Sequence, residues 1–214
     1  MSETLSRKEL FERWSSFYDP YMNQDGFPFI AYDQVLRTVI AHADFIPHHR
    51  VLDLGVGTGN LARRIPVPQA QIWGVDFSIK MLRKASKVLP NANFIQVNLL
   101  DTSWPPEMAR PFNRIISGYT LHEFPDDIKQ KLLVRLAEKY LGTDGLIVIG
   151  DISFQDLESF KEGHAQYDGL WDEDEYYWCA QPMTQDLVEL GFSVEYTQIS
   201  PCAGVYVIKY LAEL

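Results

Sequence analysis

The stretch Arg50–Ile65, which reads RVLDLGVGTGNLARRI, decides the fold class of this chain. It opens with a short apolar run that only Asp53 interrupts, as expected for a buried strand of a parallel sheet. Gly55, Gly57 and Gly59 follow, and glycine suits a chain that turns tightly and lets a ligand approach its backbone. A helix after such a turn directs free N–H groups at the ligand. The stretch therefore predicts a strand, a glycine-rich loop and a helix that together form a nucleotide-type pocket.

The glycine spacing distinguishes two kinds of nucleotide ligand. A dinucleotide-binding loop reads G-x-G-x-x-G, whereas the glycines here fall as G-x-G-x-G, with Asp53 two residues before the first. This pattern resembles the first motif of the class I S-adenosylmethionine-dependent methyltransferases, D/E-x-G-x-G-x-G. A pyrophosphate disfavours a nearby carboxylate, but S-adenosylmethionine carries an ammonium and a sulfonium, so Asp53 is compatible with it. A glycine turn without a ligand is the alternative interpretation.

Composition narrows the class of protein. The 214 residues are 46% hydrophobic and 22% charged, which is the composition of one globular domain. No apolar run approaches the roughly 18 residues of a membrane span, and the opening MSETLSRKEL lacks the apolar core of a signal peptide. The two cysteines, Cys179 and Cys202, are too few for a disulfide framework and are expected to be reduced. These features predict a soluble cytoplasmic protein.

The formal net charge of -10 argues against a nucleic-acid partner. Proteins that bind phosphate backbones usually carry a basic stripe. The basic residues Lys80, Arg83, Lys84 and Lys87 fall on one predicted helix, where a solvated helix face explains them. We therefore expect a small-molecule partner, with neither nucleic acid nor membrane involved. No metal ion is expected, and the oligomeric state stays open.

Positions after the second and third predicted strands match the cofactor contacts of the family that the loop resembles. The strand Gln71–Val75 runs into Asp76, and an acid about 20 residues past the glycines accepts hydrogen bonds from ribose hydroxyls. Phe77 is expected against the adenine face, with core packing as the alternative. After the strand Asn93–Val97 the family usually has Gly-Asp, whereas this chain has Asn98, whose side-chain oxygen can still accept from the adenine amino group.

Two neighbours of Asn98 complete the expected adenine site. The backbone around Leu99 is expected to offer an N–H to the adenine ring. Asp101 is the alternative acid if the register is shifted by a few positions. A plain turn asparagine is the competing interpretation of Asn98.

The end of the fourth predicted strand, Phe112–Ser117, is the expected methyl-transfer centre, and the resemblance implies that Ser117 lies beside the cofactor. The following GYTLHEFPD lacks the Asn/Asp-Pro-Pro-aromatic turn of base-amino methyltransferases and resembles the small-molecule branch. Tyr119 and His122 are the polar groups best placed to meet an acceptor, and His122 can act as a general base near neutral pH. Alternatively, His122 only caps or packs the next helix. A thiolate or amine acceptor would then need orientation and no protein base.

The first 45 residues are expected to be mostly helical. Apolar residues recur at helical spacing in residues 1–17 and again from Tyr32 to Ile40. The resemblance implies that this part folds over the cofactor as a lid, with Tyr18 and Tyr21 near its methionine half. Alternatively, the aromatic residues only pack the lid itself.

The segment Glu162–Pro182 is the least typical of the family. It combines several aromatic residues with the acidic run Asp172–Glu175. In related enzymes insertions at this place cover the substrate, and aromatic and carboxylate side chains suit a cationic or amine acceptor. The alternative is a solvated acidic helix start whose aromatic residues cover the core.

The remaining pattern completes the fold. A helix Asp126–Tyr140 is expected to end at the glycine-containing turn 142–145, before a buried strand. A helix Met183–Leu190 and the strands Phe192–Ile199 and Val205–Tyr210 follow, and their short connection predicts antiparallel pairing.

The chain is thus identified as a member of the methyltransferase family with an α/β, seven-stranded, mostly parallel, doubly wound sheet and an antiparallel last strand. We expect one domain, residues 1–214, with an N-terminal helical lid (1–45) and an S-adenosylmethionine-binding core (46–214). The expected function is methyl transfer from S-adenosylmethionine to a small molecule. The alternatives are a cofactor-sensing protein without transfer, a protein methyltransferase and an NAD-dependent oxidoreductase.

Overall fold

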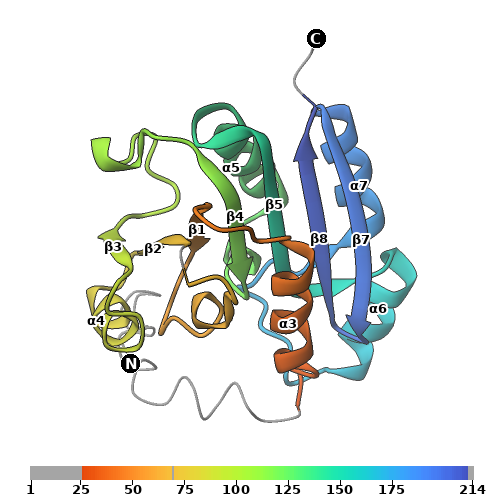
Figure 1. Ribbon diagram of the computed structural model, residues 1–214. Coiled ribbons are helices and arrows are strands. Elements are labelled where there is room, and N and C mark those ends of the chain that lie inside the picture. Colours follow the sequence, from red (N-terminus) through yellow and green to blue (C-terminus); the bar gives the residue numbers. More distant parts are fainter. Residues whose placement is uncertain (1–25, 69, 212–214) are drawn as a thin grey trace.

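The computed structural model of the chain describes residues 26–68 and 70–211 (Figure 1). The helix expected over residues 1–17, together with Tyr18 and Tyr21, lies outside the described residues. The strands are β1 (Arg50–Leu54), β2 (Gln71–Asp76), β3 (Asn93–Gln96), β4 (Phe112–Gly118), β5 (Leu141–Phe154), β6 (Trp178–Cys179), β7 (Phe192–Ser200) and β8 (Ala203–Tyr210). The helices are α3 (Tyr32–His42), α4 (Ile79–Val88), α5 (Asp126–Lys139), α6 (Leu157–Gln166) and α7 (Ala180–Glu189). Short 3₁₀ turns are η1 (Ala62–Arg64), η2 (Pro106–Met108) and η3 (Leu121–Glu123).

The sheet has the strand order β3-β2-β1-β4-β5-β8-β7, and β6 pairs with β5 outside this path. β1 to β5 pair in parallel, whereas β8 is antiparallel to both of its neighbours, which confirms the expected fold class. The chain leaves β1 toward β2 and β3 and then returns to the other side of β1 as β4. The loops after β1 and β4 therefore diverge and leave a crevice at the carboxyl ends of these strands, where open α/β sheets bind ligands.

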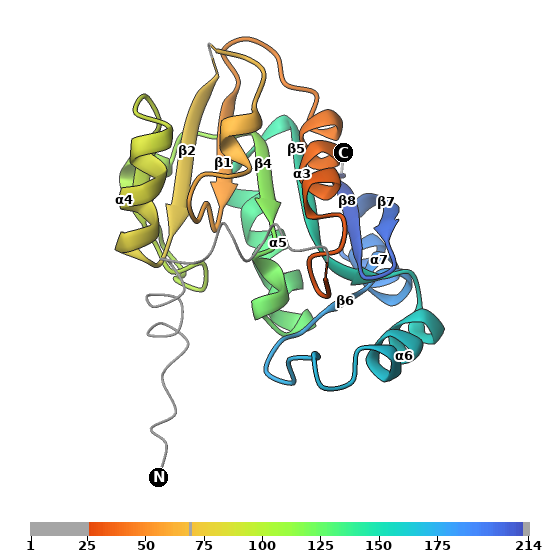
Figure 2. The same cartoon turned by 90° about the horizontal axis from the view of Figure 1, so that it is seen from below.

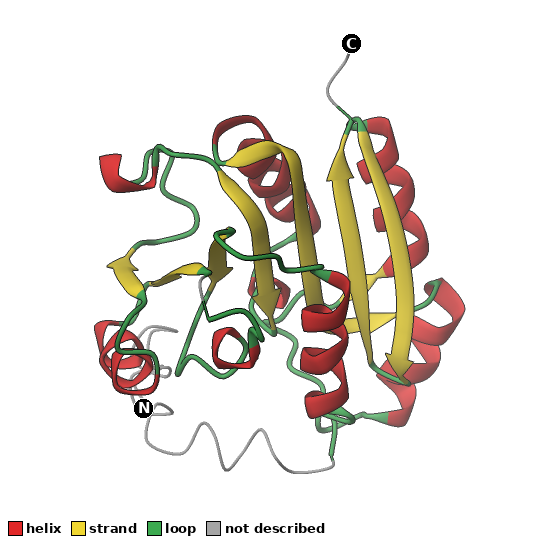
Figure 3. Cartoon of the chain, in the orientation of Figure 1, coloured by secondary structure: helices red, strands yellow, loops and turns green. Residues whose placement is uncertain are grey.

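Helices cover both faces of the sheet (Figures 2 and 3). Figure 2 shows α3 on one face and α5 and α7 on the other. The strand β5 serves both cores, because Ile147 and Ile149 pack toward α5 and α7 while Val148 and Ile152 pack toward α3. This alternation is the period of two that a strand imposes on its side chains. The doubly covered sheet gives the loops at the strand ends a rigid base.

Two further elements follow from local sequence signals. The short helix expected after the glycine loop, with its end near Pro66–Pro68, is present as the 3₁₀ turn η1, because Ile65 precedes Pro66 and adopts an extended backbone, which ends the helix. β5 begins at Leu141, before the expected turn at residues 142–145. Its pairing with β4 passes over these residues, because Phe112 pairs with Leu141 and Arg114 pairs with Leu146. The two glycines thus lie in an irregular stretch of the strand.

Within the described residues, no helix combines the length and the apolar character that crossing a membrane requires.

Candidate functional site

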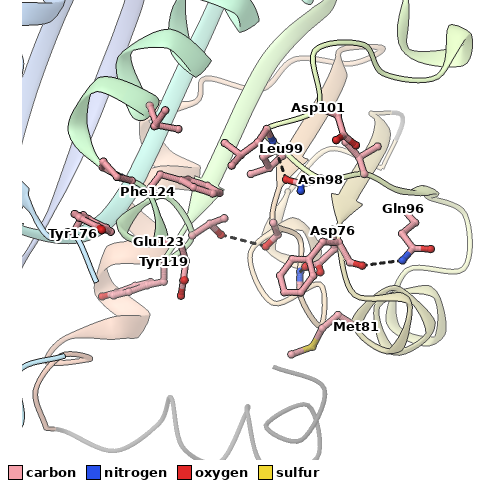
Figure 4. A pocket seen from close by; sticks show the side chains of 18 residues that line it. Asp76, Met81, Gln96, Asn98, Leu99, Asp101, Tyr119, Glu123, Phe124 and Tyr176 are labelled. Carbon is pink, nitrogen blue, oxygen red and sulfur yellow. Dashed lines mark hydrogen bonds between the residues drawn. The ribbon is translucent and has the colours of Figure 1, made fainter. Parts of the chain in front are cut away.

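A cavity of about 790 Å³ lies at the carboxyl ends of β1 to β4 (Figure 4). Its volume falls within the roughly 300–1,000 Å³ of small-molecule sites. The loop after β1 and the start of α4 form one side, and the loop after β4 forms the other. Figure 4 shows Asp76 and Met81 on the first side, and Tyr119, Glu123 and Tyr176 across the cavity from them. The crevice expected from the strand order is therefore a real cavity.

The glycine loop approaches this cavity with its backbone. Gly55 and Gly57 line the cavity and have φ angles of 64° and 52°, which lie in the left-handed region that favours glycine. A Cβ atom at Gly55 would lie 2.3 Å from the side chain of Thr120, so no larger residue fits there. At Gly57 the nearest atom to such a Cβ is 3.9 Å away, which leaves the backbone open to a ligand.

Asp76 lies at the tip of β2 and joins three elements. Its Oδ2 accepts a hydrogen bond from the Gly57 N–H at 3.0 Å, and its Oδ1 accepts from the Ser78 N–H at 2.7 Å. The hydroxyl of Ser78 caps α4 by accepting from the Met81 N–H. Burial raises the pKa of Asp76, and the two backbone donors oppose this shift. The carboxylate is held in place and still lines the cavity.

Asp53 lies behind the glycine loop rather than on the cavity wall. Its side chain is buried on β1, and burial raises its pKa well above the usual value. Its Oδ2 atom has no hydrogen-bond partner among the described residues. An orphaned buried oxygen at this place suits a cationic neighbour, but direct contact between Asp53 and a cofactor stays a prediction.

The expected adenine side is present along the ends of β2 and β3. Phe77, Asn98 and Leu99 all line the cavity. The side-chain amide of Gln96 donates to the Phe77 carbonyl at 2.9 Å and holds that turn (Figure 4). The Asn98 Oδ1 atom accepts from the Leu100 N–H at 3.0 Å, so one of its lone pairs is already used. The structure therefore brings these three residues together and leaves a weaker acceptor at Asn98 than the usual acid of the family.

The opposite wall comes from the loop after β4. Tyr119, Glu123 and Phe124 line it, and Tyr176 joins them from the segment before β6. Tyr119 has a φ of 53°, an uncommon conformation for a residue with a side chain, of the kind that clusters at functional sites. Its hydroxyl is buried without a hydrogen-bond partner in the described part of the chain. Sequence reasoning identified Tyr119 but missed Glu123 and Phe124, which stand in the same quoted stretch.

Two other expected residues lie behind this wall. Ser117 is fully buried, and its hydroxyl donates to the Leu54 carbonyl at 3.1 Å, which ties β4 to β1. His122 is also buried and is not among the lining residues. A cofactor contact by Ser117 stays a prediction, and the hydroxyl is already committed to the backbone.

His122 forms a close pair with Asp151, which follows the apolar run of β5. Its Nδ1 lies 2.6 Å from Asp151 Oδ1, and the other oxygen of Asp151 accepts from the Leu121 and His122 N–H groups. Burial lowers the pKa of His122, but Asp151, Glu175 and Glu123 outweigh it and raise the pKa from 6.5 to about 9. An imidazole that already holds both protons at neutral pH cannot accept another, so this geometry argues against the general-base role that the sequence suggested.

The segment before β6 is anchored to η3 and α5. The Tyr176 N–H donates to the His122 carbonyl at 2.7 Å, and the buried Lys129 Nζ donates to the Tyr176 carbonyl at 2.6 Å.

Most of the aromatic residues in the segment Glu162–Pro182, which were expected to cover a substrate, instead join the core on the α3 side. In that core, the Phe27 ring stacks on Tyr167 with centroids 4.2 Å apart and on Trp171 at 5.7 Å. The core alternative thus holds for this group, and Tyr176 is the member that reaches the cavity.

Comparison with known proteins adds sequence relatives. A model of the methyltransferase domain family matches residues 51–145. An uncharacterized methyltransferase of Geobacillus kaustophilus is 32% identical over 202 residues, which cover 89% of this chain and 90% of that protein. An uncharacterized methyltransferase of Oceanobacillus iheyensis is 27% identical over 217 residues, which cover 95% of this chain and 97% of that protein.

Solved structures share the fold at lower identity. The DhpI-SAM-HEP complex is 21% identical with a TM-score of 0.72, and the match covers 98% of this chain and 99% of that one. The magnesium protoporphyrin IX methyltransferase of Synechocystis with bound SAH is 18% identical with a TM-score of 0.68, over 95% of this chain and 99% of that one. At these identities the likeness concerns the fold.

Proposed function

Because the chain belongs to the class I S-adenosylmethionine-dependent methyltransferases, we propose that it methylates a small molecule held against Tyr119, Glu123 and Tyr176. The observation that carries this proposal is the cavity of about 790 Å³, in which the glycine loop and Asp76 face these three side chains. Such a cavity has room for a nucleoside cofactor on one side and a small acceptor on the other. It lies at the switch point of the sheet, where ligands of this architecture bind.

The residues on the β1–β3 side fit the cofactor. The open backbone at Gly57 suits close approach of the amino-acid end, and the orphaned Asp53 oxygen behind the loop offers an acceptor near its ammonium group. Asp76 would accept hydrogen bonds from the ribose hydroxyls. Phe77 would lie against the adenine, which is flanked by the side chain of Asn98.

Leu99 supports the adenine assignment independently. Its backbone N–H has no acceptor among the described residues, although Leu99 is buried and lines the cavity. An N–H that has no protein acceptor at a cavity wall is available to a ring nitrogen of a ligand. Tyr18 and Tyr21 lie outside the described residues, and their contact with the methionine half is part of this proposal only as a sequence prediction.

The chain contributes mainly by binding and orientation. S-adenosylmethionine supplies an electrophilic methyl carbon, and attack by the nucleophile of the acceptor breaks the methyl–sulfur bond and leaves the electron pair on sulfur. Tyr119, Phe124 and Tyr176 would hold the acceptor in line with that bond and exclude water, which by itself provides much of the rate enhancement of such reactions. Glu123 is the carboxylate of this wall and favours an acceptor with a positive charge or a hydrogen-bond donor.

The test distinguishes a small-molecule acceptor from a protein acceptor, and S-adenosylmethionine from NAD as the cofactor. Calorimetric titration should show binding of S-adenosylmethionine and S-adenosylhomocysteine and none of NAD. Transfer from methyl-labelled S-adenosylmethionine should then appear in the low-molecular-weight fraction of a panel of thiols, amines and carboxylic acids. Label that appears only in proteins of an extract would overturn the small-molecule assignment, and binding of NAD alone would overturn the cofactor site.

A further inference from the structure

Three side chains next to the cavity bring ligand atoms of the metal-binding kind together. His122, Glu123 and Glu175 each offer one such atom, and the three atoms lie within 4.8 Å of one another. The Nε2 atom of His122 is 3.7 Å from a carboxylate oxygen of Glu123 and 3.7 Å from one of Glu175. These separations are too long for hydrogen bonds. They approach the spacing of about 3–3.6 Å expected for two atoms that each lie about 2.1 Å from one ion.

The imidazole of His122 is oriented as in metal sites. A metal-binding histidine almost always donates its other ring N–H to a carboxylate or carbonyl, which fixes the tautomer and the ring plane. Here Nδ1 lies 2.6 Å from Asp151 Oδ1, and Asp151 is itself held by backbone donors, including the Ile152 N–H at 2.9 Å. The ring therefore points Nε2 toward Glu123 and Glu175.

The surroundings of the Nε2 atom favour a cationic ligand. The His122 side chain is 7% exposed, and its Nε2 atom faces the carboxylates of Glu123 and Glu175, each at 3.7 Å. The buried Lys129 Nζ donates to Asp126 and to the Tyr176 carbonyl. Two carboxylates that face one buried ring nitrogen suit a metal cation, which can replace the proton of that nitrogen.

We propose that His122, Glu123 and Glu175 bind one divalent first-row transition-metal ion, such as Zn²⁺ or Mn²⁺. An imidazole nitrogen with two carboxylate oxygens suits these ions better than Mg²⁺ or Ca²⁺, which prefer oxygen ligands throughout. Coordination displaces the Nε2 proton to solvent, and a small inward rotation of the two carboxylates closes the ligand set.

The place of the site suggests what the ion does. Glu123 also lines the cavity on its acceptor side, so open coordination positions of the ion would be available to a hydroxyl, thiol or carboxylate of the acceptor. This last step rests on the proposed function, whereas metal binding itself does not.

The experiment measures metal binding without cofactor or acceptor, so its failure is distinguishable from a failure of the proposed methyl transfer. The full chain is stripped with a chelator and titrated with Co²⁺, whose visible absorption reports the ligand set, and with Zn²⁺ and Mn²⁺ by calorimetry. His122→Asn retains an N–H donor for Asp151 but removes Nε2. Glu175→Gln removes one carboxylate charge. The matched control is Glu173→Gln, because Glu173 is an exposed acid of the same segment that contacts His164 at 3.2 Å.

We expect one ion per chain and a visible Co²⁺ band, with affinity reduced more than about tenfold in His122→Asn and in Glu175→Gln and unchanged in the control. Circular dichroism establishes that each variant is folded, and Glu175→Gln decides the matter if His122→Asn does not fold. The proposal is wrong if none of the three ions binds at millimolar concentration. It is equally wrong if binding in the folded variants equals that of the unaltered chain.

Discussion

The Oδ2 atom of Asp76 accepts a hydrogen bond from the Gly57 N–H at 3.0 Å. The other oxygen of the same carboxylate accepts from the Ser78 N–H at the start of α4. One side chain therefore joins the glycine loop after β1 to the helix after β2, and these two elements form the cofactor side of the cavity. The geometry of the loop depends on Asp76, and under the proposed function the recognition of a ribose depends on it as well.

Replacement of Asp76 should weaken cofactor binding. We expect Asp76→Ala to reduce the affinity for S-adenosylmethionine by roughly 1.5–3 kcal/mol, the contribution of a hydrogen bond to a charged group. Calorimetric titration measures this loss. Asp101→Asn is the matched control, because Asp101 also lines the cavity and is the alternative acid of the sequence prediction. Unchanged affinity in Asp76→Ala, or a loss confined to Asp101→Asn, would show that the ribose is bound elsewhere.

Gly55 should tolerate no side chain. Gly55→Ala introduces a left-handed alanine at about 1–2 kcal/mol and a clash with Thr120 at about 1–3 kcal/mol. Gly169→Ala is the control, since Gly169 has a comparable φ of 79° and no atom within 4 Å of an added Cβ. Urea unfolding should therefore show a clearly larger loss of stability for Gly55→Ala. Equal losses would mean that Thr120 moves away at little cost.

The sequence predicted the parts of the site that depend on local pattern. The apolar run, the glycine spacing and Asp76 lie within one βαβ unit, so their positions relative to one another follow from the strand and turn pattern. The short helix after the loop ends before Pro66, as the proline predicts, although it is a 3₁₀ turn. The start of β5 was wrong because glycines normally indicate a turn, and the pairing with β4 is not visible in a single segment.

The surroundings of His122 could not be predicted in the same way. Its partners Asp151 and Glu175 come from β5 and from the segment before β6, far along the chain, and the fold alone brings them together. Asp151 within the run LIVIGDI, residues 146–152, was a usable signal, since an acid in an otherwise apolar buried strand needs a partner.

Removal of the His122 side chain should destabilise the fold without loss of cofactor binding. His122→Ala leaves the buried Asp151 carboxylate without its charged partner, and loss of one partner of a buried pair costs about 3–5 kcal/mol. His122→Asn keeps a donor for Asp151 and should cost less. Urea unfolding in the presence of a chelator measures both, and calorimetry should find the S-adenosylmethionine affinity of the folded variants unchanged. A folded His122→Asn that no longer binds the cofactor would show that His122 belongs to the cofactor side.

The two cysteines should resist modification at pH 8. Both are free and buried. Burial, with Asp156 and Asp126 nearby, raises the pKa of the Cys179 thiol from 9.0 to about 11, and burial also raises the pKa of Cys202. At three units below its pKa, only about one Cys179 thiol in a thousand is a thiolate, which is the reactive form. Reaction with Ellman's reagent should therefore be slow in the native protein at pH 8 and should accelerate as the pH rises toward 11, whereas the urea-unfolded chain should react fast at both cysteines.

The raised folded-state pKa of Cys179 favours its protonated thiol. The contribution of this thiol to stability is therefore complete below pH 9 and is lost as the pH passes through 11. Rapid labelling of a native thiol at pH 8 would mean that the loop or helix that covers it opens readily.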